Sequence, residues 1–364
     1  MKYSNISPKT ALFATAVAAS LVFAGQLFAA NDEEDGFLGM TTPDISKPDR
    51  AVFDNRTSFV PPTELQIVDV YIKEELSLSE AEAIDELTAV SVSVEGDIEL
   101  LPPDDDTVKA LLEAIESFEK STEEGSEKAI ADSSSNEESN AFEGESAPAE
   151  SVIGADTRVR VTATTRYPFR TAGRIDIGCT GTLIGKRHVL TAGHCVYNIN
   201  NDKWYSALSF SPGQNGASRP YGKISWKRVI SVRGWTRKHK RNYDYAMIVL
   251  KEDIGNSVGW MGYGWKNPMP KYNVNINGYP GDKPTGTMWH SYCKMKTITT
   301  HRLYYPCDTA GGMSGSGVYV YWKNENRRII YGVHAYGVDS TGYNGGTRIR
   351  KAVFNNLKKW KATY

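Results

Sequence analysis

The chain has 364 residues, 23% of them charged, and a formal net charge of −1. That total hides two opposed parts. Residues 31–150 carry 33 acidic and 7 basic side chains, a net charge of −26, whereas residues 151–364 carry 10 acidic and 33 basic ones, a net charge of +23. Charge blocks of this size attract each other. The basic part would bind polyanions non-specifically, but no nucleic-acid fold signature accompanies it, so no specific nucleic-acid partner is predicted.

Residues 1–30 have the pattern of a secretory signal peptide. Two lysines precede an apolar run over residues 11–23, two alanines end the segment, and it contains no acidic side chain. The run is too short for a membrane anchor. We therefore expect a secreted protein without a membrane anchor.

The acidic part, residues 31–150, is interpreted as a pro-region. The runs LQIVDVYI and VSVSVEGDIEL alternate like strands, and DTVKALLEAIESFEK has helical spacing. They predict a small folded α/β segment over residues 62–120. Residues 121–150 are mostly Glu, Ser and Ala, which predicts a disordered, cleavable linker. The pro-region would cover the basic part or help it fold; the alternative is a solvating tail without specific contacts.

Residues 151–364 contain three motifs with the residues of a nucleophilic triad. GCTGTLIGKRHVLTAGHC ends beside His194, NYDYA carries Asp244, and CDTAGGMSGSG carries Ser314. A serine hydroxyl needs an imidazole to accept its proton and a carboxylate to orient that imidazole. The order His, Asp, Ser is that of chymotrypsin-type proteases, whereas α/β-hydrolases run Ser, Asp, His.

Glycines surround the predicted nucleophile. Gly312 and Gly315 allow the backbone to turn sharply, so that the amides of Gly312 and Ser314 converge on one point. Two convergent amides are what an oxyanion hole requires.

The basic part also has the pattern of an all-β fold. Short runs rich in β-branched and aromatic residues, such as 182–190 and 245–250, are separated by Gly, Asn and Pro turns. Near the end of the chain Val353, Leu357 and Trp360 recur at helical spacing, which predicts one amphipathic C-terminal helix.

From Ser151 onward the sequence resembles the bacterial glutamyl endopeptidases, a branch of the chymotrypsin-like serine proteases. The resemblance runs collinearly through SVIGADTRVRV, TAGHCVYN, NYDYA, IGNSVGWMGYG, NGYPGDK, DTAGGMSGSG and GTRIRKAVFNNLKKW. It implies two six-stranded antiparallel β-barrels with the active site between them, followed by a C-terminal helix. It also implies an endopeptidase that acts on proteins or peptides, cleaving after Glu and less readily after Asp. We expect a monomer.

All four cysteines lie in the basic part, and an even number in an exported domain favours disulfides. The resemblance implies the pairs Cys179–Cys195, around the histidine strand, and Cys293–Cys307. Zinc is a poor alternative, because His194 is needed as a base and no tight Cys/His cluster exists. We predict no cofactor and no catalytic metal; a structural calcium stays open.

Substrate choice depends on residues near the serine. Asp308, six residues before Ser314, would by itself predict cleavage after Lys or Arg. By resemblance, Thr309 and His334 grip a substrate carboxylate instead. The backbone at Ala335 and Gly337 would pair with the bound peptide.

Two rival functions remain at this level. One is a Lys/Arg-specific protease that uses Asp308, and the other is a catalytically silent binding or toxin module on the protease fold.

Maturation is predicted at the end of the linker. By resemblance the mature chain begins at Ser151, which follows Glu150, so the enzyme would recognise its own processing site. Met313 stands where digestive proteases carry an Asp before the serine, so their activating ion pair with the new amine cannot form.

Overall fold

The computed structural model describes residues 50–58, 78–129 and 152–364, with side chains of the 105–129 helix described up to residue 117. The predicted signal peptide and the predicted processing site at Glu150 and Ser151 lie outside these residues. Within the described ranges, no helix combines the length and the apolar character needed to cross a membrane.

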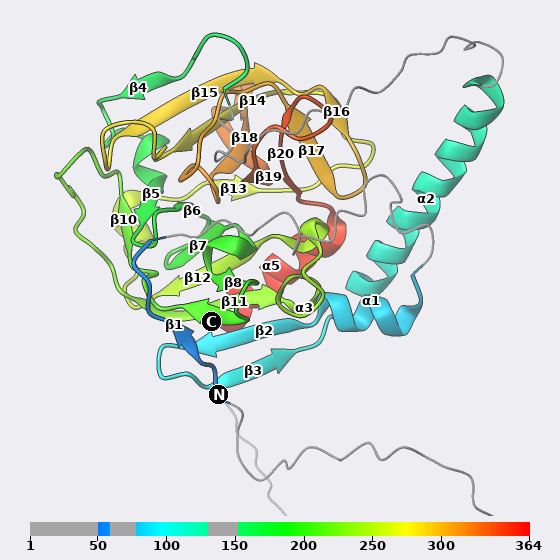
Figure 1. The fold of residues 1–364 in the computed structure, drawn as a ribbon, viewed down its shortest axis with the longest axis horizontal. Coiled ribbons are helices and arrows are strands. Elements are labelled where there is room, and N and C mark those ends of the chain that lie inside the picture. Colours follow the sequence, from blue (N-terminus) through cyan, green and yellow to red (C-terminus); the bar gives the residue numbers. More distant parts are fainter. Residues whose placement is uncertain (1–49, 59–77, 130–151) are drawn as a thin grey trace, which may run out of the picture. The chain divides into compact units, whose positions relative to one another are not determined.

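The first barrel consists of six antiparallel strands of the protease part, in the order β10-β5-β6-β7-β12-β11 (green in Figure 1). A bridge between Phe210 on β10 and Ile224, just before β11, joins the two ends of this order. The strands are β5 (Ala172–Ile175), β6 (Thr180–Leu183), β7 (His188–Thr191), β10 (Phe210–Pro212), β11 (Trp226–Val232) and β12 (Ala246–Leu250). A short hairpin of β8 (Tyr197–Asn198) and β9 (Lys203–Tyr205) lies beside them.

The second barrel has the strand order β16-β17-β20-β19-β18-β14-β15-β4, with β13 beside β19; all its strands except β4 follow the first barrel in the chain. Its strands are β4 (Val159–Val161), β13 (Gly262–Tyr263), β14 (Asn273–Gly278), β15 (Met288–Lys294), β16 (Thr297–Ile298), β17 (Arg302–Tyr305), β18 (Gly317–Trp322), β19 (Arg327–Tyr336) and β20 (Asn344–Arg348). The predicted chymotrypsin-like all-β fold is confirmed, but the second sheet has nine strands instead of the expected six, because the short strands β4, β13 and β16 add to it.

The predicted C-terminal helix is α5 (Lys351–Thr363). Its apolar side chains Val353, Leu357 and Trp360 are all buried, and the Trp360 ring stacks on Tyr245 of the first barrel at a centroid distance of 5.6 Å. The periodic apolar residues therefore fix α5 against the first barrel.

The described pro-region residues form α1 (Glu80–Leu87), β2 (Ala89–Ser93), β3 (Ile98–Leu101) and α2 (Asp105–Ala129). Ser79 and Glu82 begin α1 with reciprocal side-chain and backbone bonds, a capping box. The expected linker is wrong over residues 121–129, because α2 continues through them; Glu, Lys and Ala there favour a helix. The strand-like run LQIVDVYI and the rest of the linker lie outside the described residues.

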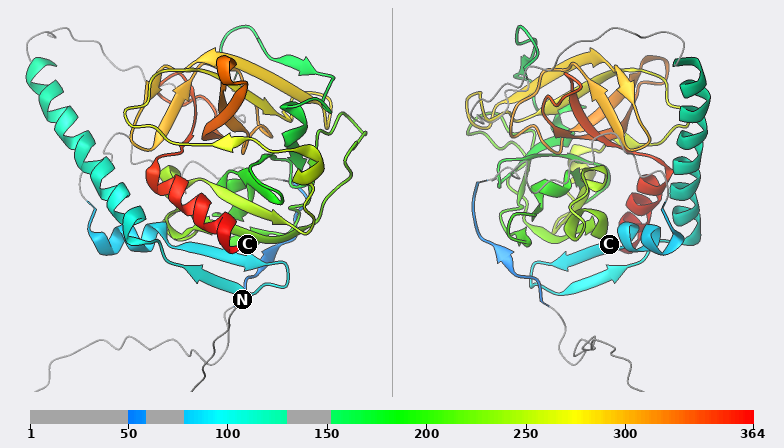
Figure 2. Two further views of the ribbon diagram at one scale, coloured as in Figure 1. Left: turned by 180° about the vertical axis from the view of Figure 1, so that it is seen from behind. Right: turned by 45° about the vertical axis from the view of Figure 1, so that its right-hand side comes forward.

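These elements extend the first barrel. Strand β2 pairs antiparallel with β11, which gives an eight-stranded sheet ending in β2 and β3. The short strand β1 (Phe53–Asp54) pairs in parallel with β9. Helix α2 contacts α5, and Figure 2 shows the two helices from two sides.

Candidate active site

His194 and Asp244 are bonded to each other in the first barrel. His194 lies in the 3-10 turn Gly193–Cys195, which follows β7. Asp244 ends the 3-10 turn Arg241–Tyr243 and lies two residues before β12. His194 Nδ1 is 2.7 Å from Asp244 Oδ2, and the His194 backbone N–H donates to Asp244 Oδ1 at 2.9 Å. Both carboxylate oxygens thus hold His194, and Nε2 is the ring nitrogen that Asp244 leaves for a nucleophile.

Asp244 is fully buried, and its environment keeps it ionised. Burial raises the pKa of the carboxyl, but the charge and hydrogen bonds of His194 together lower it by more, so the pKa lies below its usual range. The Thr347 hydroxyl donates to the Asp244 backbone carbonyl at 2.8 Å and fixes the segment from the second barrel.

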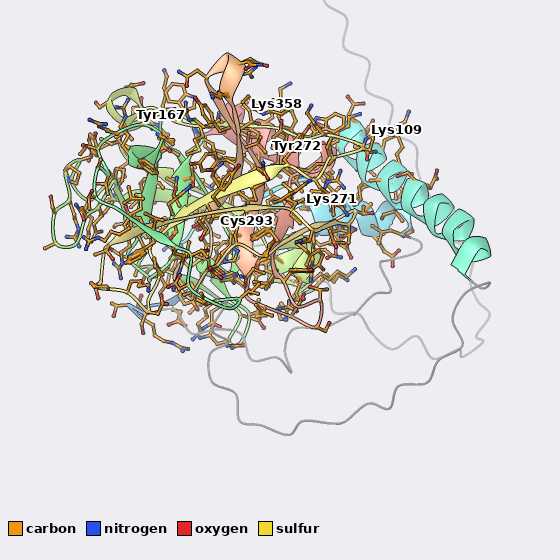
Figure 3. All side chains as sticks on the ribbon, turned by 90° about the horizontal axis from the view of Figure 1, so that it is seen from above. Lys109, Tyr167, Lys271, Tyr272, Cys293 and Lys358 are labelled. Atoms are coloured by element: carbon orange, nitrogen blue, oxygen red, sulfur yellow. A yellow bond between two sulfur atoms is a disulfide. The ribbon has the colours of Figure 1, made fainter. Side chains whose placement is uncertain are left out.

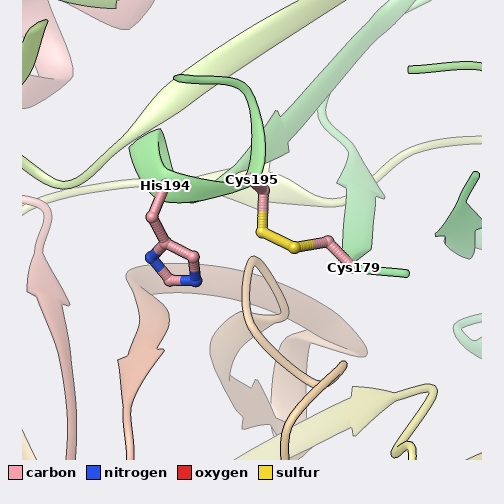
Figure 4. A group of neighbouring side chains, drawn as sticks. All are labelled: Cys179, His194 and Cys195. Carbon is pink, nitrogen blue, oxygen red and sulfur yellow. A yellow bond between two sulfur atoms is a disulfide. The ribbon is translucent and has the colours of Figure 1, made fainter. Parts of the chain in front are cut away.

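Two disulfides are present, as predicted. Cys179–Cys195 lies beside the imidazole, and its Cα atoms are 6.0 Å apart (Figure 4). Cys293–Cys307 joins β15 to the segment that leads to Ser314; Cys293 is labelled in Figure 3. The first bond ties the His194 turn to the start of β6, and the second ties the serine segment to the second barrel.

Ser314 lies in a turn of the second barrel that rests against the first. Its carbonyl accepts a hydrogen bond from Thr180 N at 2.9 Å and lies 3.6 Å from Cys195 Sγ. The turn therefore adjoins the disulfide beside His194, and residues from both barrels meet there. Ser314 is partly exposed, as a nucleophile must be.

Backbone geometry at the turn requires glycine at two positions. Gly312 has φ +95° and Gly315 has φ +88°. A Cβ on Gly312 would lie 2.6 Å from the Tyr279 carbonyl oxygen, and one on Gly315 would collide with the Thr180 carbonyl oxygen. Among the described backbone hydrogen bonds, the amides of Gly312 and Ser314 donate none, so both are available to an oxyanion.

Thr309 and His334 are both buried near the serine turn. Thr309 is fully buried, and within the described part of the chain its hydroxyl has no hydrogen-bond partner. His334, on β19, has Nδ1 2.8 Å from the Tyr305 hydroxyl. Burial, with a smaller effect of His194, lowers the pKa of His334 to about 3, so its imidazole is neutral at pH 7.

The predicted peptide-pairing residues lie at the end of the same strand. Ala335 is at a β-bulge, where the register between β19 and β20 shifts between His334 and Tyr336, and Gly337 follows the strand. A bulged residue is left out of the ladder, so its backbone can pair elsewhere.

Asp308 does not have the position expected of a pocket residue. Its Oδ1 accepts a hydrogen bond from Ile153 N at 2.8 Å, and its Oδ2 accepts from Thr157 N at 2.8 Å and Thr157 Oγ1 at 2.5 Å. The side chain is 1% exposed. Both oxygens are thus directed at residues 153–157, and Asp308 is an anchor of that segment.

A second anchor of the same segment was missed from the sequence. The buried Arg158 guanidinium bonds Asp156 at 2.8 Å and also pairs with Asp282 in the loop after β14. Hydrogen bonds from Arg158, against an opposing effect of burial, hold the pKa of Asp156 well below its usual range. Because Asp282 lies 124 residues after Arg158, no local sequence pattern reveals their pairing.

One group of possible metal ligands occurs among the described residues: Cys179, His194 and Cys195. Its two sulfur atoms are joined in a disulfide, and His194 Nδ1 faces Asp244. Metal-binding cysteine requires a thiolate, so this group does not fit a metal.

The comparisons with known proteins identify the class. The family model described as Trypsin matches residues 157–355, more than half of the chain, so the protein belongs to the trypsin family and is a serine endopeptidase. Within this family it resembles glutamyl endopeptidases. "Glutamyl endopeptidase" of Bacillus licheniformis is 44% identical over 221 residues, covering 58% of this chain and 69% of the relative.

Two further proteins are similar to this chain, each over 58% of its length. "Extracellular metalloprotease" of Bacillus subtilis is 39% identical over 221 residues, covering 58% of this chain and 69% of the relative. The solved structure entitled "Structure of Glu endopeptidase in complex with MPD" has a TM-score of 0.53 and 31% identity, and it covers 58% of this chain and 99% of its own. The predicted resemblance to glutamyl endopeptidases is confirmed.

Proposed function

We propose that the protein hydrolyses peptide bonds after Glu, and less readily after Asp, with His194, Asp244 and Ser314 as its triad. The observation that supports this specificity best is the contrast between two neighbours. The Asp308 carboxylate is fully engaged with residues 153–157, whereas the adjacent Thr309 hydroxyl has no partner among the described residues.

The proposed mechanism assigns one role to each of these residues. Ser314 Oγ attacks the scissile carbonyl while His194 Nε2 accepts its proton, and Asp244 stabilises the imidazolium that forms. The amides of Gly312 and Ser314 stabilise the oxyanion. His194 then gives the proton to the leaving amine, and a water molecule, activated by the same imidazole, hydrolyses the acyl-enzyme.

A substrate carboxylate would satisfy the pocket. The buried Thr309 hydroxyl can donate to it, and a negative charge beside His334 would raise the pKa of this imidazole toward protonation. Charge-assisted hydrogen bonds contribute about 1.5–3 kcal/mol each. An uncharged side chain in the same place would leave the hydroxyl unsatisfied, which costs about 1–3 kcal/mol.

A Lys or Arg side chain would fit less well. To bind it, Asp308 would have to exchange three hydrogen bonds from Ile153 and Thr157 for one ion pair. The two backbone N–H groups released in this way would need new acceptors. This cost disfavours the Lys/Arg-specific alternative.

Secretion and self-processing belong to the same proposal. Residues 1–30 would direct export, and the enzyme would cleave its own chain after Glu150, so that the mature protein begins at Ser151. Protein and peptide substrates and the chain's own pro-region are the proposed partners, and the protease domain is proposed to be monomeric, in the sense that it does not associate with a second copy of itself.

A peptide panel tests the function. We would compare the purified enzyme on peptides that differ only in Glu, Asp or Lys before the scissile bond, with Ser314→Ala as the control. The proposal predicts rates in the order Glu, Asp, Lys and no turnover by the control. Preference for Lys would establish the trypsin-like rival, and no cleavage of any peptide would establish the silent module.

A further inference from the structure

The described pro-region, residues 50–58 and 78–129, is here called the docked segment. Its apolar side chains share the hydrophobic core of the first barrel. Leu87, Val92 and Leu111 are each fully buried in the same cluster as Trp235 and Trp360. A segment that forms part of a core does not depend on a covalent linker to stay in place.

One attachment lies just after His194 in the chain. Asp54, 6% exposed, accepts hydrogen bonds from Asn198 Nδ2 at 3.0 Å and Asn201 Nδ2 at 2.9 Å. Burial raises the pKa of this carboxyl, but its hydrogen bonds, that of Asn201 foremost, lower it to about 2. The Asp54 backbone carbonyl also accepts from Ser206 N at 3.2 Å. The docked segment therefore fixes the β8–β9 hairpin.

A second attachment lies just before Asp244. Asp85 pairs with Arg233 at 2.8 Å, and the buried Glu86 forms an ion pair with Lys240. Arg233 begins the short helix α3 (Arg233–Thr236), and Lys240 precedes the 3-10 turn that leads into Asp244. The end of α1 thus contacts the segment from Arg233 to Lys240, which leads to Asp244.

Helix α3 links this attachment to the imidazole. Its Trp235 is fully buried, and the ring lies edge-on to His194 with a centroid distance of 6.4 Å. A Cβ on Gly193 would lie 2.8 Å from Trp235 Cδ1, so the His194 turn rests directly on this ring. A shift of α3 would therefore move the Trp235 ring and change the position of His194.

A third attachment joins the sheet and the C-terminal helix. Strand β2 pairs with β11 from Ala89, opposite Val232, to Ser93, opposite Arg228. Lys359 Nζ on α5 donates to the Pro102 carbonyl at 2.7 Å. On the same sheet, acidic Glu99 of β3 also pairs with basic Arg228 of β11 at 3.4 Å.

We propose that the docked segment stays bound to the protease domain after the linker is cut, as a non-covalent subunit that positions His194 and Asp244. The hydrogen bonds and ion pairs of its described residues reach the β8–β9 hairpin, β11, α3, Lys240 and α5. None of those described interactions is made with Ser314, Thr309 or His334. This inference does not rest on the proposed specificity for Glu.

The test uses the full chain with Ser314→Ala and a recognition sequence for a site-specific protease inserted within residues 130–149. After that cut, size-exclusion chromatography shows whether the two fragments elute together. We expect co-elution both at 0.15 M NaCl, where charges are screened beyond about 8 Å, and at 1 M NaCl, where they are screened beyond about 3 Å. Salt should not separate the fragments, because the shared core is apolar. Elution as two separate species would overturn the proposal.

A matched pair of variants tests the attachment beside Asp244. Glu86→Ala leaves Lys240 without its buried partner and is expected to speed dissociation of the cut complex by about tenfold or more. Glu80→Ala, at an exposed position in the first turn of the same helix, should dissociate like the parent. Equal dissociation rates for the two variants would refute the role of Glu86.

The positioning role is measured with Ser314 restored. Loss of the docked segment from the cut Glu86→Ala enzyme should lower kcat at least tenfold and leave KM within about twofold. If kcat stays unchanged after the segment is removed, the segment does not position the triad.

Discussion

Replacing Asp308 tests whether this residue anchors residues 153–157 or determines substrate specificity. Asp308→Ala removes the acceptor of three hydrogen bonds at a side chain that is 1% exposed. Two backbone N–H groups, of the partly buried Ile153 and the exposed Thr157, lose their acceptor, and a hydrogen bond to a charged group contributes about 1.5–3 kcal/mol. Because water can replace the acceptor at the exposed Thr157, we expect the free energy of unfolding to fall by about 1.5–3 kcal/mol.

Asp308→Asn provides the matched control. The amide keeps one acceptor oxygen but turns an N–H₂ group toward the other donors, so its cost should be intermediate. Thermal unfolding and the rate of hydrolysis after Glu would be measured for both variants in the mature enzyme. A Lys/Arg-specific protease would instead lose cleavage after Lys with little change in stability, and that result would refute the anchor.

Four other outcomes are expected. Ser314→Ala and His194→Ala should each lower kcat by roughly 10⁵–10⁶ with unchanged thermal unfolding, because triad members act as a unit; turnover by purified Ser314→Ala would exclude the mechanism. His334→Ala should lower kcat/KM for Glu peptides by about 10²-fold or more, measured beside Lys peptides; an equal loss on both would argue against a carboxylate pocket. Removing Cys293–Cys307 by paired Ser substitutions should cost about 3 kcal/mol in denaturant unfolding, and an unchanged midpoint would contradict this. Stability should fall as pH drops below about 6.5, because the unfolded chain protonates its histidines while burial lowers the folded pKa of His188 to about 4; a His188→Gln variant should show a shallower fall.

Local patterns were sufficient for the parts of the fold that depend on short-range sequence. The glycines around Ser314 are needed for backbone angles that other residues avoid, and the spacing of Val353, Leu357 and Trp360 is that of one helix face. Such features are visible as motifs. That the Ser314 turn lies against the first barrel, where Thr180 N donates to the Ser314 carbonyl, is known only from the fold.

Long-range contacts explain what the sequence could not reveal. Asp308 stands where a pocket residue was expected, but its partners Ile153 and Thr157 precede it by about 150 residues. Similarly, Glu86 is one of many acidic residues in the pro-region, and only its burial beside Lys240 distinguishes it. The start of the linker was misjudged because residues 121–129 are polar yet favour a helix.

The most direct measurement compares two peptides that differ only in Glu or Gln before the scissile bond. The two side chains are nearly equal in size, so their ratio of kcat/KM at pH 7 isolates the recognition of a carboxylate by Thr309 and His334. We predict a preference for Glu of about 10²-fold or more, since a buried site built for a charged group rejects its neutral analogue. Equal rates for the two peptides, or faster cleavage of a Lys peptide than of either, would contradict the proposed function.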